Sequence, residues 1–257
     1  MDTLTREHII KAAQCDRFGR LSPHDMLLLM QETVGEHTAL LNLGRETLAK
    51  ENAVWVLVSQ ELQVLKYPKY MDKISITVYP TAPRRTLFPR YVMFDSDKGE
   101  RLINAVSLWT LMDIDTLSMV KIPWVESAIP KNKDKTPPMR YPSRANSFSE
   151  NTQEIIYSPK FSDFDLNGHI NNTRCVLWLT DILGEDILYK HPLERITINY
   201  NREIRGKEDI TLRLAQLAQS ENKFSLSCTR GDLSHIDIEA QCMQDNKDTV
   251  SSLAFGV

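Results

Sequence analysis

The chain has 257 residues, of which 42% are hydrophobic and 25% are charged, and its formal net charge is −3. This composition is typical of a globular protein with a hydrophobic core, made of one large domain or two of ordinary size. The lack of net positive charge argues against nucleic acid as a partner, and no apolar run approaches the roughly 18 residues of a membrane-spanning helix.

The four cysteines are widely spaced and form no C-x-x-C pair. We therefore expect free thiols and no metal site. The N-terminal residues lack the charged-then-apolar pattern of a secretory signal. Together these features predict a cytoplasmic protein.

The first half of the chain predicts one helix followed by several strands. Ser22 is a good N-cap and Pro23 a good first helical residue, so a helix is expected to begin there. Apolar and polar residues then alternate in short runs, which favours antiparallel strands with one solvated face. The runs are 55–59, 74–79, 91–94 and 106–111, with a hairpin turn at 95–99.

The second half repeats this order after a proline-rich polar linker. A helix is expected to be capped by Asn171 or Asn172 and to end at Gly184. Four strand-like runs follow, with a hairpin turn at 230–232. The runs are 196–200, 210–214, 224–228 and 236–240.

This repetition predicts a tandem duplication of one α+β unit, in which each helix buries its apolar stripe against a curved antiparallel sheet. The expected organisation is an N-terminal unit at 1–128, a linker at 129–151 and a C-terminal unit at 152–257. A single mixed domain with accidental internal similarity is the alternative.

The segment Asp163–Asn172 is the richest in chemistry, because it gathers carboxylates, amides and an imidazole before a helix. A helix N-terminus favours developing negative charge. Asp165, Asn167 and His169 are therefore candidate catalytic residues. Local capping explains the asparagines that follow, but it does not explain the histidine.

Comparison of the two halves supports a functional interpretation. Aligning Ser22 with Asn171 places Arg20 opposite His169 and Phe18 opposite Asn167. The polar cluster then belongs to the second half only, as expected of chemistry rather than packing. A second polar run, 199–205, follows on the next strand, and its Glu203 could reach the start of the helix and activate water.

These stretches resemble the acyl-ACP thioesterases, and the resemblance covers nearly the whole chain. It is carried by Asp165–Asn172, Trp178 and Ile198–Glu203, with weaker matches at 18–22, 31–32 and 67–70. The resemblance implies two fused hotdog units, each a long helix wrapped by an antiparallel sheet. It also implies hydrolysis of fatty acyl-ACP to free fatty acid and acyl carrier protein, in fatty acid biosynthesis.

By the same resemblance the family's catalytic residues fall on Asp165, Asn167, His169 and Glu203. The acyl chain is expected in the first unit, at Met26, Leu27, Met30 and Trp55. Two positions depart from the plant members: Ile204 stands where they commonly have Cys, and Cys175 where they usually have Tyr. A cysteine nucleophile is therefore not expected at position 204.

Thioester hydrolysis needs a base, for which Glu203 or Asp165 could serve, and donors for the developing oxyanion. We expect these donors to be the backbone N–H groups near Gly168 and His169. His169 and Asn167 are expected to position the carbonyl and water, with Asp165 orienting one of them. A covalent acyl-carboxylate route stays open.

Several alternatives and partners remain. Asp163, Asp165 and Asn167 match the start of a calcium-binding EF-hand loop, but Arg174 stands where that loop needs Glu. No metal or organic cofactor is expected. An acyl-CoA thioesterase and a binding module without turnover are the competing functions. Acyl-chain preference is not predicted, and either a monomer or a homodimer is compatible with two fused units.

Basic residues suggest a contact for an acidic carrier protein, although ordinary linker solubility explains them equally well. Arg90 belongs to the same basic group. The candidate contact residues are Arg84, Arg85, Lys131, Lys133 and Lys135.

Overall fold

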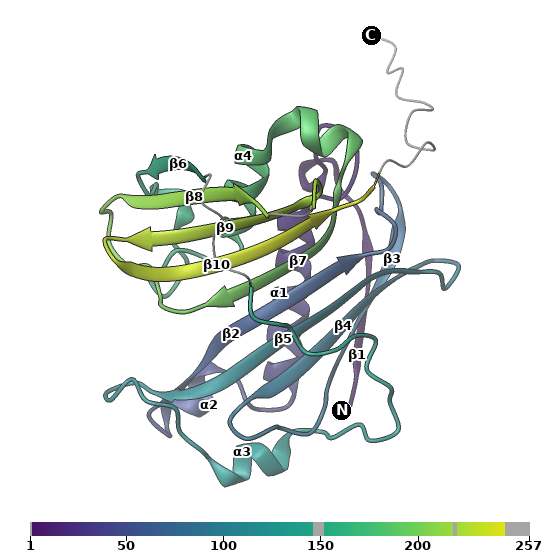
Figure 1. Cartoon of the computed structure of the whole chain (residues 1–257). Coiled ribbons are helices and arrows are strands. Elements are labelled where there is room, and N and C mark those ends of the chain that lie inside the picture. Colours follow the sequence, from purple (N-terminus) through teal and green to yellow (C-terminus); the bar gives the residue numbers. More distant parts are fainter. Residues whose placement is uncertain (1, 146–151, 218–219, 245–257) are drawn as a thin grey trace.

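A computed structural model describes residues 2–145, 152–217 and 220–244. In these residues a 10-stranded antiparallel sheet has the order β1-β3-β4-β5-β2-β7-β10-β9-β8-β6 (Figure 1). The strands are β1 (Leu4–Ile9), β2 (Ala53–Val64), β3 (Lys73–Pro80), β4 (Phe88–Ser96), β5 (Arg101–Asp113), β6 (Thr152–Tyr157), β7 (Leu193–Tyr200), β8 (Ile210–Gln216), β9 (Lys223–Arg230) and β10 (Leu233–Cys242).

The sheet consists of two five-stranded halves with the same strand order. Read from its outer edge, the first half runs β1-β3-β4-β5-β2 and the second runs β6-β8-β9-β10-β7. The halves join where β2 pairs with β7, from Ser59 opposite Asn199 to Gln63 opposite Arg195. The predicted α+β class and the internal repeat are therefore confirmed, and the two halves share one continuous sheet.

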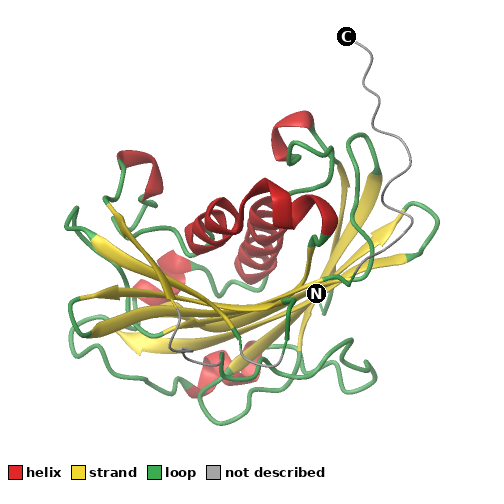
Figure 2. Ribbon diagram, turned by 45° about the horizontal axis from the view of Figure 1, so that its top comes forward, coloured by secondary structure: helices red, strands yellow, loops and turns green. Residues whose placement is uncertain are grey.

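Two long helices lie in the concave face of this sheet (Figure 2). Helix α1 (Pro23–Leu40) begins as predicted, with the Ser22 hydroxyl accepting a hydrogen bond from the Asp25 N–H at 3.0 Å. Its counterpart α4 (Arg174–Lys190) has Thr173 as its N-cap and so starts one or two residues later than the expected caps Asn171 or Asn172 imply; Asn171 Oδ1 instead accepts from the Thr173 N–H before the helix. Gly184, at φ +74°, interrupts α4 with a kink rather than ending it.

Short elements complete the described fold. Helices α2 (Arg45–Ala49) and α3 (Pro123–Ala128) cover one end of the first half. A 3₁₀ turn precedes each long helix: η1 (Ala12–Gln14) and η2 (Phe161–Asp163). Strand β1 and these short helices were not predicted.

The core runs without a break beneath both long helices. Val92, Ala105, Leu62 and Ile196 pair in one row across β4, β5, β2 and β7, and each is at most 1% exposed. Burial of an aliphatic side chain of this size stabilises the fold by roughly 1.5–3 kcal/mol. The buried row therefore continues across the join between the halves.

The connection between the halves crosses the opposite, convex face of the sheet. Met139 and Tyr141 pack against Tyr79 and Tyr91 of the first half. At the far end the Ala145 N–H donates to Asn199 Oδ1 on β7 at 2.7 Å. Residues 146–151 of the expected linker, and 245–257 of the expected C-terminal unit, lie outside the described residues.

Candidate active site

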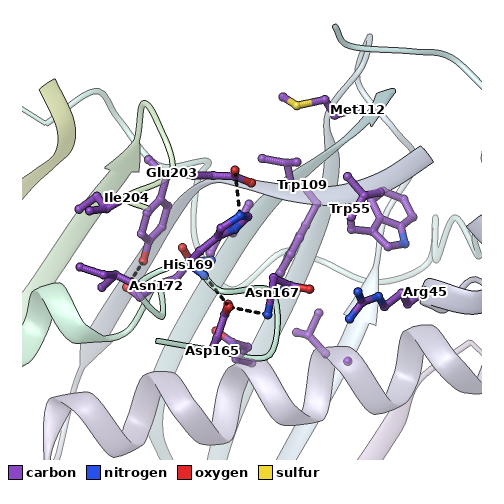
Figure 3. Close-up of a pocket in the computed structure, with 18 of the residues that line it drawn as sticks. Arg45, Trp55, Trp109, Met112, Asp165, Asn167, His169, Asn172, Glu203 and Ile204 are labelled. Atoms are coloured by element: carbon purple, nitrogen blue, oxygen red, sulfur yellow. Dashed lines mark hydrogen bonds and ion pairs between the residues drawn. The ribbon is translucent and has the colours of Figure 1, made fainter. Parts of the chain in front are cut away.

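The polar segment before α4 folds into a tight loop held by Asp165. Its Oδ1 accepts hydrogen bonds from the backbone N–H groups of Asn167 at 2.8 Å and His169 at 3.2 Å. Gly168 closes the loop at φ +73°, a left-handed conformation that favours glycine. The loop presents Asp165, Asn167 and His169 to a cavity (Figure 3).

The first half contains a copy of this loop. Asp16 Oδ1 accepts from the N–H groups of Phe18 at 2.9 Å and Arg20 at 3.0 Å, and Gly19 has φ +74°. The alignment made from the sequence therefore holds in three dimensions. The prediction that the whole polar cluster belongs to the second half needs one correction, because the aspartate is present in both copies.

The residues that differ between the two loops have different surroundings. In the first copy Arg20 is buried, bonds Asp16 Oδ2 at 2.8 Å, and lies over the rings of Phe18 and Tyr67. In the second copy His169 lines the cavity instead. Asn167 and His169 are thus the loop's site-specific residues, whereas the aspartate shapes the loop in both places.

Glu203 reaches the imidazole of His169 from the other side. Strand β7 ends at Tyr200, so Glu203 lies in the following loop. The Ile170 N–H donates a hydrogen bond to the Ile204 carbonyl of this loop at 3.0 Å. Glu203 Oε2 lies 3.3 Å from His169 Nε2 (Figure 3). The same oxygen lies 2.9 Å from Arg205 Nη2. Its Oε1 has no partner among the described residues and can accept a proton from water.

His235, on β10, was not predicted as part of the site. Its Nδ1–H donates to the Glu203 carbonyl at 3.1 Å, and its own carbonyl accepts from the N–H groups of Asn201 and Arg202. Burial lowers the pKa of His235, and the neighbouring Arg230 and Arg202 act in the same direction. A neutral imidazole therefore fixes the loop that carries Glu203.

The surrounding thiol and phenol are not suited to nucleophilic catalysis. Burial raises the pKa of Cys175 to about 12, and its Sγ donates to the Asn172 carbonyl at 3.1 Å. Burial also raises the pKa of Tyr200, whose hydroxyl donates to the same carbonyl at 2.9 Å. The side chain of Ile204 is 2% exposed, so it packs in the protein interior.

The backbone N–H groups expected to bind the oxyanion are engaged within the loop in this structure. The Gly168 N–H donates to the Asp165 carbonyl at 3.0 Å, and the His169 N–H donates to Asp165 Oδ1. Neither group is available to a substrate oxygen while the loop keeps this shape. The carboxamide of Asn167, exposed at the cavity, is a better donor because no described residue bonds it.

The cavity has a volume of about 1030 Å³ and lies between α1, the sheet of the first half and the two loops that carry His169 and Glu203. Trp55 lines it as predicted, together with Trp109 and Val34. Met26, Leu27 and Met30 do not: they are at most 1% exposed and belong to the core beneath α1. The cavity uses the C-terminal half of that helix, so the prediction was about one turn too early.

The calcium alternative conflicts with the geometry of Asp163. Its Oδ2 accepts from the Tyr157 hydroxyl and the Lys160 N–H, both at 2.7 Å. The Arg174 guanidinium lies 3.7 Å from the other carboxylate oxygen. The guanidinium is already a cation beside this carboxylate, so we interpret the role of Asp163 as structural.

The predicted carrier-protein residues do not line the cavity. Arg84 lies over the ring of Tyr141 and Lys135 over that of Tyr79, at the convex face. Lys131, Lys133 and Arg85 are also absent from the cavity wall. The basic side chains that do line it are Arg45, Arg90, Arg202 and Arg205.

The fold and the site define a double-hotdog protein in which a carboxylate–imidazole pair lines a cavity. Solved structures share this fold, among them the following two. An acyl-ACP thioesterase of Bacteroides thetaiotaomicron superposes with a TM-score of 0.85 at 20% identity, covering 94% of this chain and 98% of that one. A 12:0-ACP thioesterase of Umbellularia californica gives 0.77 at 19% identity, covering 94% and 97%.

The chain belongs to the acyl-ACP thioesterase family. The model of the family's N-terminal domain matches residues 2–125, and that of its C-terminal domain matches residues 147–241. An acyl-[acyl-carrier-protein] hydrolase of Cuphea viscosissima is 27% identical over 192 residues, 70% of this chain and 47% of that protein. A palmitoyl-acyl carrier protein thioesterase of Gossypium hirsutum is 26% identical over 220 residues, 80% and 53% respectively.

The chain thus spans about half the length of these plant relatives. In the part of the chain that the structure describes, no helix combines the length and apolar character needed to cross a bilayer.

Proposed function

We propose that this chain hydrolyses the thioester of fatty acyl-ACP, releasing a free fatty acid and acyl carrier protein in fatty acid biosynthesis. The observation that carries the proposal is the 3.3 Å contact between Glu203 Oε2 and His169 Nε2 in the cavity wall, with Glu203 Oε1 bonded by no described residue. Membership of the family gives this geometry its reaction class.

In the proposed reaction Glu203 is the general base. Its Oε1 takes a proton from water, and the resulting hydroxide attacks the thioester carbonyl carbon. The carbonyl oxygen becomes negatively charged and accepts a hydrogen bond from the Asn167 carboxamide. When the tetrahedral intermediate collapses, the C–S bond breaks and the thiolate leaves with the proton held by Glu203.

The other residues have positioning roles in this scheme. His169 holds the carboxylate of Glu203 through Oε2, so that Oε1 faces the water. Asp165 keeps Asn167 and His169 in place through its two backbone hydrogen bonds. A covalent route is the alternative: a Glu203 oxygen attacks the thioester carbon, the C–S bond breaks and a mixed anhydride forms. Water that then attacks the glutamyl carbonyl releases the fatty acid and leaves solvent oxygen in Glu203.

The proposed partner is acyl carrier protein bearing an acyl-phosphopantetheine arm, and the proposed compartment is the cytoplasm. All four cysteines are free, which supports a reducing environment. We propose that the chain acts as a monomer or as a homodimer, because β2–β7 pairing already joins two units within one chain.

Matched octanoyl-ACP and octanoyl-CoA test this function when free fatty acid is quantified at equal concentrations. The proposal expects a higher kcat/KM for the ACP substrate. Equal or higher rates on CoA would reassign the chain to acyl-CoA hydrolysis. Tight binding of acyl-ACP with no fatty acid released would identify a binding module.

A further inference from the structure

Arg90 is a buried cation in the wall of the cavity. It lies on β4 and is 2% exposed. Its guanidinium makes one long hydrogen bond, from Nη1 to the Pro89 carbonyl at 3.4 Å, and lies 6.0 Å from the ring centroid of Trp55. No carboxylate of the described residues lies within 4.0 Å of it. The sequence had suggested a surface position for this residue, and the structure corrects that.

An unpaired charge in this position restricts what can share the cavity. Burial lowers the pKa of Arg90 to about 10, so the side chain stays protonated at neutral pH. Solvent entering the cavity can hydrate the guanidinium. An apolar chain that displaces this solvent leaves charged donors without acceptors, which is strongly unfavourable.

The strand register shows how far Arg90 lies from the reaction centre. Arg90, Ser107, Gln60 and Ile198 pair in one row across β4, β5, β2 and β7. Val92, which belongs to the buried row described above, lies two residues from Arg90 on β4. Side chains two residues apart in a strand point to the same face, so Arg90 faces the side of the sheet that α1 covers. Three strand spacings of roughly 4.8 Å separate Arg90 from β7, about 14 Å in all.

The loop that carries Glu203 follows directly from the end of β7, at Tyr200, and the His169 loop is bonded to it through the Ile170 N–H and the Ile204 carbonyl. An extended chain advances by about 1.2 Å per bond, as the polypeptide backbone does, so about 12 bonds span this distance. An acyl group of roughly that length would bring its methyl end to the guanidinium.

Resting on the proposed hydrolysis, we propose that Arg90 determines acyl-chain specificity, by excluding chains whose methyl end would reach or pass its guanidinium. The preferred substrates are then saturated acyl groups of about ten carbons or fewer, since these leave the guanidinium hydrated. The large apolar wall formed by Trp55 and Trp109 serves the part of the chain nearer the thioester.

The test compares wild type with Arg90→Met on acyl-ACPs from hexanoyl to palmitoyl. Methionine fills a similar volume without charge, and replacing an uncompensated buried charge in this way is not expected to lower Tm. The ratio of kcat/KM for palmitoyl to that for octanoyl is expected to rise about tenfold or more in Arg90→Met. Arg90→Lys keeps the charge and is expected to keep the wild-type preference.

Arg101→Met is the matched control, because this arginine on β5 pairs with Asp95 and does not line the cavity. Its chain-length profile is expected to equal that of wild type. Superimposable profiles for wild type and Arg90→Met would overturn the inference. A second result would also overturn it, namely a wild-type preference for acyl chains that end in a carboxylate over chains of equal length that end in a methyl group. Arg90 would then bind the end of the chain instead of excluding it.

A second readout separates this inference from the proposed function. Displacement of a fluorescent fatty acid by free fatty acids of the same lengths reports chain discrimination without turnover. If wild type hydrolyses no acyl-ACP, the proposed function fails. The inference still stands if Arg90→Met binds palmitate at least about tenfold tighter than wild type does and binds octanoate with unchanged affinity. It fails if the two proteins bind palmitate with equal affinity.

Discussion

Asp16 and Asp165 make the same pair of hydrogen bonds in two copies of one loop. In each case Oδ1 accepts from the N–H groups two and four residues later. The loop therefore needs an acceptor at this position whether or not a cavity lies beside it. In the second copy the same loop presents His169 to the cavity. The aspartate is therefore needed for the shape of the loop, and His169 is the residue that differs for the chemistry.

The first prediction concerns this shared acceptor. Asp16→Ala and Asp165→Ala each leave two backbone donors unpaired, so each is expected to lower the free energy of unfolding by about 1–3 kcal/mol. Asp165→Asn keeps an acceptor oxygen and is expected to restore most of that loss. Urea unfolding measures all three. A stability of Asp165→Asn as low as that of Asp165→Ala would show that the charge, and not the acceptor, holds the loop.

A second prediction assigns His235 a positioning role. Removing its donor in His235→Leu frees the loop that carries Glu203, and kcat for acyl-ACP is expected to fall about 10- to 100-fold with little change in KM. His235→Asn places an amide N–H near the former Nδ1 and is expected to recover most of the rate. Equal losses in both variants, or a loss confined to KM, would contradict this role.

The pH dependence of stability gives a third prediction. Because burial lowers the pKa of His235 below its ordinary value of 6.5, the unfolded chain takes up this proton first as the pH falls. The free energy of unfolding of wild type is therefore expected to decrease from about pH 6.5 downward, toward the folded-state pKa. His235→Asn lacks this contribution, so the difference between the two proteins is expected to change across that range. Parallel curves would refute the assignment.

A fourth prediction concerns docking of the carrier. Arg202 is exposed at the cavity, and the structure gives its side chain no hydrogen-bond or ion-pair partner among the described residues. Arg202→Glu is expected to raise KM for acyl-ACP about threefold or more at low salt, with a smaller effect at high salt. Arg84→Glu is the matched control at the convex face. A larger effect there would favour the patch predicted from the sequence.

Local signals explain which parts of the fold could be predicted. The Ser22–Pro23 start of α1 and the alternating strand runs depend on neighbouring residues alone. Strand β1 was not predicted, because three of its residues are exposed at the sheet edge and show no alternation of apolar and polar side chains: Thr5, Arg6 and Glu7. The pairing of β2 with β7 is a long-range contact that no local pattern encodes.

The candidate site follows the same division. Asp165, Asn167 and His169 lie within one segment and could be found together, whereas His235 becomes part of the site only because the loop after β7 folds over β10. Arg90 did carry a signal that was not used. It alternates with Val92 and Phe94, both fully buried, which places all three on the same face of β4.

The contact between Glu203 and His169 is tested most directly by single-turnover hydrolysis of acyl-ACP by Glu203→Gln and His169→Ala, alongside binding of the same substrate. The account predicts that Glu203→Gln lowers the chemical step by about 100-fold or more and that His169→Ala lowers it by a smaller factor. Both variants should bind acyl-ACP and unfold as wild type does. A wild-type single-turnover rate in Glu203→Gln would contradict the account.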